Sequence, residues 1–206
     1  MTEPPLHATP VTGVILAGGL GRRMGGVDKG LQTLHGKPLV QWVIERFAPQ
    51  VDELLINANQ NVERYRALGY RVIPDAIDGF AGPLAGLHRA LTEARHERVA
   101  TVPCDSPFLP QDLIARLTAA LDAQRADLAV ARTGEQPHPV FCLCRKAVLG
   151  SLTAFLGAGG RKIDAWYASL ATIEVPFDDE AAAFSNINTR DELASFESAG
   201  RRPERA

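Results

Sequence analysis

One stretch of the chain, residues 14–29, constrains the fold and the function more than any other. It reads VILAGGLGRRMGGVDK, so an apolar run passes directly into a glycine-rich, basic segment that ends at Lys29. Glycine allows backbone conformations with positive φ and lets a ligand approach the main chain closely. Exposed backbone N–H groups together with two arginines and a lysine suit a polyanion. We therefore expect a nucleoside triphosphate to lie over the end of the first strand.

The spacing of these residues excludes the two commonest phosphate-binding loops. A P-loop requires G-x-x-x-x-G-K-[ST], whereas Lys29 follows Asp28 and precedes Gly30. A dinucleotide-binding loop requires G-x-G-x-x-G, and Met24 occupies the place of the third glycine. The remaining alternative is a solvated basic surface loop. The apolar strand that leads directly into the segment argues against that alternative.

Length and composition bound the class of protein. A chain of 206 residues with 46% hydrophobic residues fits one globular domain. The net charge of −2 gives no general cationic surface, which argues against nucleic acid as a partner. Residues 1–10 lack the pattern of a signal peptide, and no apolar run approaches the ~20 residues that a membrane helix needs. The sparse cysteines, Cys104, Cys142 and Cys144, indicate reduced, packed thiols and a cytoplasmic location.

Short apolar runs alternate with segments of helical periodicity along most of the chain. This alternation predicts an α/β fold: one three-layer, Rossmann-like domain over residues 11–197, with a mostly parallel sheet that becomes mixed in its later part. Residues 1–10 are expected to be flexible, and residues 198–206 to form a disordered tail. The predicted strands are residues 11–17, 51–57, 70–73, 98–102, 127–131, 140–143 and 171–175.

Polar residues follow several of these predicted strands. In open α/β sheets, ligands bind outside the carboxyl ends of the strands, so we expect the glycine-rich loop, Asn57, Asp75 and Asp105 to meet there. Asp105 is a candidate ligand for Mg²⁺, which prefers one or two carboxylates together with phosphate oxygens of the substrate. Turn or cap roles are the alternative for Asp105, and from the residues alone they explain Asn57 and Asp75 better.

Four short motifs together resemble a known family of enzymes. Nucleotidyltransferases that attach a nucleoside monophosphate to a phosphorylated acceptor carry a similar set. The doubled glycine before x-Asp-Lys-Gly is most similar to the molybdenum cofactor guanylyltransferases, which join GMP to molybdopterin. The similarity extends from about Val11 to about Glu197. The motifs are L-A-G-G (16–19), R-M-G-G (23–26), D-K-G (28–30) and P-C-D-S-P (103–107).

The resemblance implies a nucleotidyltransferase that uses GTP, Mg²⁺ and molybdopterin or molybdenum cofactor as the acceptor. It implies catalytic roles for Arg23, Lys29 and Asp105, with Asp105 as the metal ligand. Guanine offers N1–H and N2–H₂ as a donor pair that a carboxylate can accept, so we expect GTP to be preferred to ATP. The residues implied in nucleotide binding are Leu16, Ala17, Gly18, Gly19, Lys29, Asn57, Asp75 and Asp105.

The acceptor side is less clear from the sequence. Arg161 and Lys162 stand at an expected helix start and suit a phosphate or a pterin, although a solvated helix start explains them nearly as well. His138 resembles a residue that lines the family's cofactor groove, with a structural histidine as the alternative. The late S-N-I-N-T block also resembles the family, which implies Asn186 and Asn188 near the acceptor or the metal. Thr189 and Glu192 fit a capping box that starts the last helix.

In the implied reaction, the acceptor's terminal phosphate attacks the α-phosphorus of GTP in line, and pyrophosphate leaves. Both reactants are anions, so the enzyme has to position them and offset their charge. Two alternatives stay open: a CTP-dependent cytidylyltransferase acting on the same cofactor or on a sugar or polyol phosphate, and a GTP-binding regulatory module without transfer activity. We expect a monomer whose protein partners are cofactor-insertion enzymes and molybdoenzyme chaperones.

Overall fold

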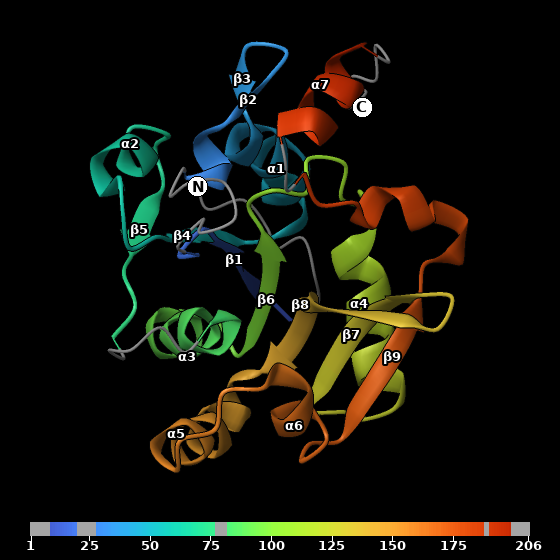
Figure 1. Ribbon diagram of the computed structural model, residues 1–206. Coiled ribbons are helices and arrows are strands. Elements are labelled where there is room, and N and C mark those ends of the chain that lie inside the picture. The colour runs from blue at the N-terminus through green and yellow to red at the C-terminus, as the bar shows by residue number, and fades with distance from the viewer. Residues whose placement is uncertain (1–8, 20–27, 77–81, 188–189, 199–206) are drawn as a thin grey trace, which may run out of the picture.

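A seven-stranded sheet forms the centre of the computed structural model, which describes residues 9–19, 28–76, 82–187 and 190–198 (Figure 1). The strands lie in the order β5-β4-β1-β6-β8-β7-β9. A separate antiparallel pair is formed by β2 (Thr33–Leu34) and β3 (Lys37–Pro38). The strands of the main sheet are β1 (Val11–Leu16), β4 (Glu53–Asn57), β5 (Arg71–Ile73), β6 (Arg98–Pro103), β7 (Leu128–Thr133), β8 (Gln136–Arg145) and β9 (Thr172–Pro176).

The sheet is mostly parallel, and β8 is the strand that makes it mixed. β1 pairs in parallel with β4 and β6, β4 with β5, and β7 with β9. β8 runs antiparallel between β6 and β7. It follows β7 after a tight turn in which Gly134 has φ +53°, a conformation that favours glycine. The predicted fold class is therefore confirmed, including the mixed portion late in the sheet.

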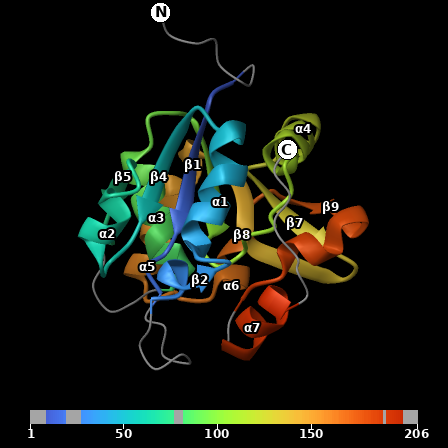
Figure 2. The same cartoon turned by 90° about the horizontal axis from the view of Figure 1, so that it is seen from above.

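Helices cover both faces of the sheet (Figures 1 and 2). α1 (Leu39–Phe47) and α4 (Leu113–Ala123) pack on one face through a core that includes Phe47 and Leu117. α3 (Pro83–Glu93), α5 (Leu149–Gly157) and α6 (Ile163–Tyr167) pack on the other through Leu87 and Trp166. The inner strands bury apolar side chains on both faces, which explains why they read as nearly continuous apolar runs.

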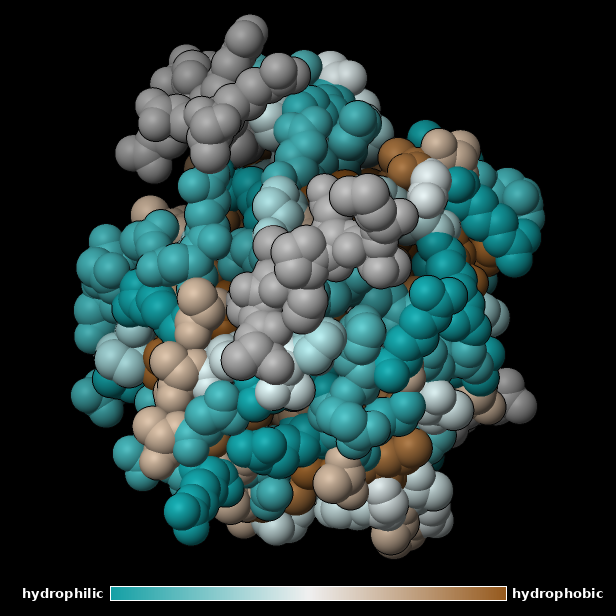
Figure 3. All heavy atoms as spheres, turned by 180° about the vertical axis from the view of Figure 1, so that it is seen from behind, coloured by the Kyte–Doolittle hydropathy of each residue, from teal (hydrophilic) through white to brown (hydrophobic). Residues whose placement is uncertain are grey.

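Smaller elements complete the fold. α2 (Val62–Arg66) follows β4, and α7 (Arg190–Ser198) lies near β2. Four short 3-10 turns are η2 (Lys29–Leu31), η3 (Ala48–Gln50), η4 (Lys146–Val148) and η5 (Asp178–Phe184). None of the helices among the described residues has the length and apolar character needed to cross a bilayer. Hydrophilic residues predominate on the face opposite to that of Figure 1 (Figure 3).

The register of β8 corrects the expected position of one candidate residue. The sequence predicted a strand at residues 140–143 with His138 just before it, whereas β8 begins at Gln136 and contains His138. Val130 pairs with Cys142 while Ala131 pairs with His138, so residues 139–141 leave the ladder in a bulge. His138 is thus a strand residue fixed by pairing on β7.

Candidate active site

The carboxyl end of β1 lies between the carboxyl ends of β4 and β6. The backbone N–H of Ala17 donates to the carbonyl of Asn57 at 2.8 Å on one side. On the other side, the N–H of Cys104 donates to the carbonyl of Leu16 at 3.2 Å. The segment from Leu16 to Gly19, predicted to bind nucleotide, therefore leaves the sheet between Asn57 and the residue that follows Cys104, which is Asp105.

Lys29 and Asp105 form an ion pair at this edge. Lys29 Nζ lies 3.3 Å from Asp105 Oδ2, and their side chains are 26% and 9% exposed. Burial raises the pKa of the Asp105 carboxyl, and the nearby Lys29 ammonium opposes that rise. The two residues are 76 positions apart in the chain. The fold brings them to the same edge of the sheet, which confirms that prediction. Arg23, the third predicted catalytic residue, lies outside the described residues.

Asn57 and Asp75 meet in a hydrogen-bonded network on the β4 side of the edge. Asn57 Nδ2 donates to Asp75 Oδ1 at 2.8 Å and to the carbonyl of Ile73 at 3.1 Å. Asn59 Nδ2 donates to Asp75 Oδ2 at 2.8 Å and to the carbonyl of Gly18 at 3.3 Å. The N–H of Asp75 in turn donates to Asn59 Oδ1 at 2.8 Å. The carboxylate of Asp75 is therefore held in a fixed orientation beside the glycine-rich loop.

Asn59 is the member of this network that the sequence reasoning missed. Its two-point contact with Asp75 and its bond to Gly18 make it the link between the strand ends and the loop. A signal was present, because Asn59 is a second asparagine just after the end of β4, where ligands of parallel sheets bind. Asn57, singled out at a strand end, therefore made Asn59 a candidate as well.

The residues at this edge fit one divalent cation that is bound mainly through its substrate. Among the described residues, no group of three or more histidines, cysteines and acidic residues comes together as a protein-only metal site. Asp105 contributes one buried carboxylate, which is the kind of ligand that Mg²⁺ combines with water and phosphate oxygens. The donor set thus fits Mg²⁺ held between Asp105 and a nucleotide.

Asn186 is the acceptor-side residue that the structure brings to Asp105. The hydroxyl of Ser106 donates to Asn186 Oδ1 at 2.5 Å. The N–H of Ile187 donates to the carbonyl of Asp105 at 2.9 Å. Asn188, expected beside it, lies outside the described residues, as does Thr189 of the predicted capping box.

His138 lies in an aromatic cluster. Its ring stacks on Phe184 with centroids 4.6 Å apart, and its edge meets Phe141. His138 Nε2 is 2.8 Å from the hydroxyl of Thr133, and burial lowers the pKa of the imidazole. These contacts give His138 a packing role, which was the alternative to acceptor binding.

Arg161 and Lys162 lie on the connection between α5 and α6. Both are exposed. Arg161 donates to the carbonyls of Leu156 and Gly160, and so caps the end of α5. Lys162 directly precedes α6, which confirms the expected helix start. These contacts support the local, structural role that the sequence left open for Arg161.

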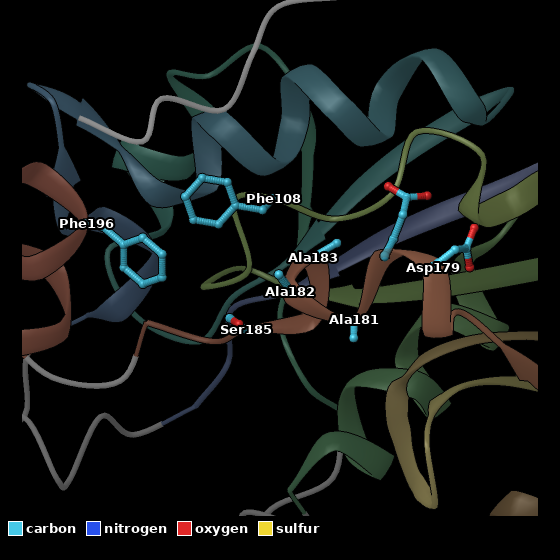
Figure 4. Close-up of a pocket in the computed structure, with 8 residues that line it drawn as sticks. Phe108, Asp179, Ala181, Ala182, Ala183, Ser185 and Phe196 are labelled. Atoms are coloured by element: carbon cyan, nitrogen blue, oxygen red, sulfur yellow. The ribbon is translucent and has the colours of Figure 1, made fainter. Parts of the chain in front are cut away.

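A groove of about 300 Å³ opens beside Ser185. Phe108 and Phe196, whose ring centroids are 5.1 Å apart, form its apolar wall (Figure 4). Asp179 lies on the opposite side, on η5, and Glu180 of the same turn also lines the groove. The groove is therefore lined by aromatic and acidic side chains, of which Asp179 is paired with Arg116.

The sequence model of one protein family, described as the MobA-like NTP transferase domain, matches residues 13–173. The chain belongs to this family. Among its curated relatives, a molybdenum cofactor guanylyltransferase of Cupriavidus necator is 52% identical over 91% of this chain and 96% of its own. A protein of the same name from Shewanella putrefaciens is 49% identical over 93% of this chain and 97% of its own.

Solved structures agree with membership in the MobA-like family. The molybdopterin-guanine dinucleotide biosynthesis protein A of Archaeoglobus fulgidus is 25% identical, with a TM-score of 0.76 over 92% of this chain and 98% of its own. A CMP:2-keto-3-deoxy-manno-octonic acid synthetase is 14% identical, with a TM-score of 0.66 over 93% of this chain and 97% of its own. The second likeness shows the fold alone. This MobA-like chain is a nucleotidyltransferase, as its motifs indicated.

Proposed function

We propose that this protein transfers GMP from GTP to the terminal phosphate of molybdopterin or molybdenum cofactor, forming the guanine dinucleotide cofactor and releasing pyrophosphate. Relatives about half identical over nine-tenths of the chain, named molybdenum cofactor guanylyltransferases, support the substrates. The observation that carries the chemistry is the Lys29–Asp105 pair beside the loop at the end of β1. The pair consists of one cation and one buried carboxylate at the edge of the sheet where, in this proposal, the triphosphate binds.

The chemistry needs positioning and charge compensation. The acceptor phosphate is already ionised at neutral pH, so it needs no general base, and its oxygen attacks the α-phosphorus as the bond to pyrophosphate breaks. Lys29 and Arg23 would stabilise the negative charge that moves toward the leaving pyrophosphate. Amides of the glycine-rich loop would add fixed donors at the same oxygens. Each of these groups acts most strongly when charge develops on the leaving group.

Asp105 would hold a magnesium ion in this reaction. Mg²⁺ bound there supplies positive charge to the oxygens of the triphosphate. Burial raises the pKa of Asp105, and the Lys29 ammonium opposes that rise because it favours the carboxylate, which is the form that binds a metal. Lys29 would therefore have two roles: it would bind the triphosphate, and it favours the ionised form of Asp105.

The Asn57–Asp75–Asn59 network suits guanine recognition. Asp75 would accept hydrogen bonds from N1–H and N2–H₂ of guanine, while adenine presents no such donor pair. Both oxygens of Asp75 already accept one amide bond each, which leaves further lone pairs directed by a fixed carboxylate. Backbone groups of Leu16, Ala17 and Gly18 would complete the base and ribose contacts, with Gly19 and Lys29 near the phosphates.

For the acceptor, the proposal assigns Asn186 the leading role. Its hydrogen bond to Ser106 sets it one residue from Asp105, where the terminal phosphate of molybdopterin has to arrive. Asn188 and Lys162 would also contact the pterin, as would His138 and Arg161 in addition to the local contacts described above. We also propose a cytoplasmic monomer that meets cofactor-insertion enzymes and molybdoenzyme chaperones. The buried free thiols of Cys104, Cys142 and Cys144 are consistent with a reducing compartment.

The deciding experiment incubates the protein with GTP, Mg²⁺ and molybdopterin and follows the pterin product by mass spectrometry. The expected product carries one added GMP, with one pyrophosphate released for each transfer. Parallel reactions with CTP and ATP, and with the Asp105→Asn variant, serve as controls. Faster transfer from CTP would favour the cytidylyltransferase alternative. Tight GTP binding without any transfer would favour a regulatory module.

A further inference from the structure

We propose that Tyr65 and Asn61 of the α2 region are positioning residues that hold Asp28 and thereby aim Lys29 at its phosphate-binding site. The inference rests on the proposed function in one respect, namely that Lys29 binds the triphosphate. Tyr65 and Asn61 donate hydrogen bonds to Asp28. They act on the residue that precedes Lys29.

Both oxygens of Asp28 accept hydrogen bonds from this region. The Tyr65 hydroxyl donates to Asp28 Oδ1 at 2.5 Å, and Asn61 Nδ2 donates to Asp28 Oδ2 at 3.0 Å. Burial raises the pKa of Tyr65, so its hydroxyl stays protonated and remains a donor. A carboxylate held at both oxygens cannot rotate without losing one of two charge-assisted bonds.

The turn after Asp28 transmits this orientation to Lys29. The N–H of Leu31 donates to the carbonyl of Asp28 at 3.3 Å, and that of Gln32 to the carbonyl of Lys29 at 3.0 Å. These two bonds form η2, the turn that directly follows Asp28. Fixing Asp28 therefore fixes the direction in which the Lys29 side chain leaves the backbone.

Gly30 shows how closely α2 approaches this turn. A Cβ atom at Gly30 would lie 2.6 Å from the Tyr65 hydroxyl and 3.2 Å from Cys104 Sγ. Glycine is required here because the turn is enclosed between the tyrosine and the residue before Asp105. Because Gly30 packs against Cys104, the turn at Lys29–Leu31 lies next to Asp105, the residue that follows Cys104.

Asn61 adopts a backbone conformation that costs energy for most residues. Its φ of +49° and ψ of +32° lie in the left-handed region, which asparagine enters more readily than other non-glycine residues. In this conformation its carbonyl accepts the N–H groups of Arg64 and Tyr65, which starts α2. The side chain of Asn61 donates to Asp28 Oδ2. Backbone strain of this kind is typical of functional positions.

The first test measures the amine of Lys29 directly and does not depend on activity. The chain contains four lysines, so the rates of reductive methylation at Lys29, Lys37, Lys146 and Lys162 can be followed separately by peptide mass spectrometry. Tyr65→Phe keeps the ring that fills the core and removes the donor. We expect the rate at Lys29 to change at least about twofold, because its partner geometry is loosened. Lys37, which pairs with Glu45, serves as the internal control.

An unchanged rate at Lys29, or equal changes at all four lysines, would overturn the proposal. Tyr70→Phe is the matched variant, since it makes the same chemical change at another tyrosine. Asn61→Gly is the second variant, because glycine tolerates the left-handed backbone while the side-chain donor is lost. Asn61→Gly should change the methylation rate at Lys29 in the same direction as Tyr65→Phe.

The second test uses transfer activity with GTP and molybdopterin. Tyr65→Phe should lower kcat about tenfold, the scale expected when a catalytic group is slightly misplaced. In a Lys29→Ala background the same change should cause no further loss, because its effect passes through Lys29. Independent, multiplying losses would indicate a general structural role and overturn the proposal. If the wild-type protein transferred no GMP, the proposed function would fail, while the methylation rates would still decide this inference.

Discussion

Ser106 and Asn186, 80 residues apart in the chain, are joined by a hydrogen bond of 2.5 Å from the serine hydroxyl to Asn186 Oδ1. A second hydrogen bond joins the neighbouring residues, in which the N–H of Ile187 donates to the carbonyl of Asp105 at 2.9 Å. Two adjacent bonds therefore fasten the late segment to the loop that carries Asp105, the proposed metal ligand. These two bonds connect the segment of Asn186, the proposed acceptor residue, to the segment of Asp105.

Replacing Ser106 with alanine should weaken acceptor binding selectively. Loss of one hydrogen bond to Asn186 is expected to raise KM for molybdopterin about three- to tenfold. KM for GTP should stay near the wild-type value, because Ser106 faces Asn186. Initial rates measured against each substrate in turn check this expectation. Thr92→Ala, which removes the hydrogen bond from the Thr92 hydroxyl to the carbonyl of His88 within α3, is the control. A parallel rise in both KM values would contradict the assignment of Asn186.

Removing either charge of the Lys29–Asp105 pair should abolish most activity. Lys29→Ala and Asp105→Asn are each expected to lower the rate of pyrophosphate release by about 10²–10³, the usual cost of losing one preorganised charge. The double variant should lose little more, since the two groups act on the same phosphates. Asp105→Asn should change Tm little, because relief of the buried carboxylate and loss of the ion pair with Lys29 act in opposite directions. Near wild-type turnover in either single variant would refute its assigned role.

Asn59 should control the choice of base. Asn59→Ala removes the two contacts that fix Asp75 and the one that reaches Gly18, so the carboxylate can rotate. We expect the ratio of kcat/KM for GTP to that for ATP to fall at least about tenfold, because a site built on oriented hydrogen bonds discriminates through them. Gln60→Ala, at the exposed next position, is the control. Equal losses with both nucleotides would mean that Asn59 only stabilises the fold.

The sequence predicted the parts of the fold that depend on local pattern. Apolar runs located the strands of the sheet to within a few residues, and the polar residues after them identified Asn57, Asp75 and Asp105. The rule that ligands bind at the carboxyl ends of parallel strands predicted that such residues meet, and the structure brings Asn57 to Asp75 and Lys29 to Asp105. Parallel pairing places strand ends at a common edge whatever the connections between them, which explains this success.

Contacts between distant segments were not predictable in the same way. Nothing local in the segment 61–69 indicates that Tyr65 donates to Asp28, because a tyrosine in a helical stretch is read as a core residue. The stacking of His138 on Phe184 depends on the bulge in β8 and on η5 packing back over the sheet. Both relationships are set by tertiary packing, which periodicity alone does not encode.

Acidification should destabilise the protein partly through His138. Burial against Phe184 lowers the pKa of His138 below its value in the unfolded chain. Between the two pKa values the unfolded state binds more protons, so stability falls as pH decreases through the unfolded value of about 6.5. His88 contributes in the same direction, because burial and the nearby Arg89 lower its pKa.

We therefore expect the wild type to lose more Tm than His138→Gln between about pH 7.5 and pH 5.5. The double variant His138→Gln/His88→Gln should lose less Tm than His138→Gln alone. Scanning calorimetry across that range is the measurement, and a loss as steep in the double variant as in the wild type would assign the acid sensitivity to other groups.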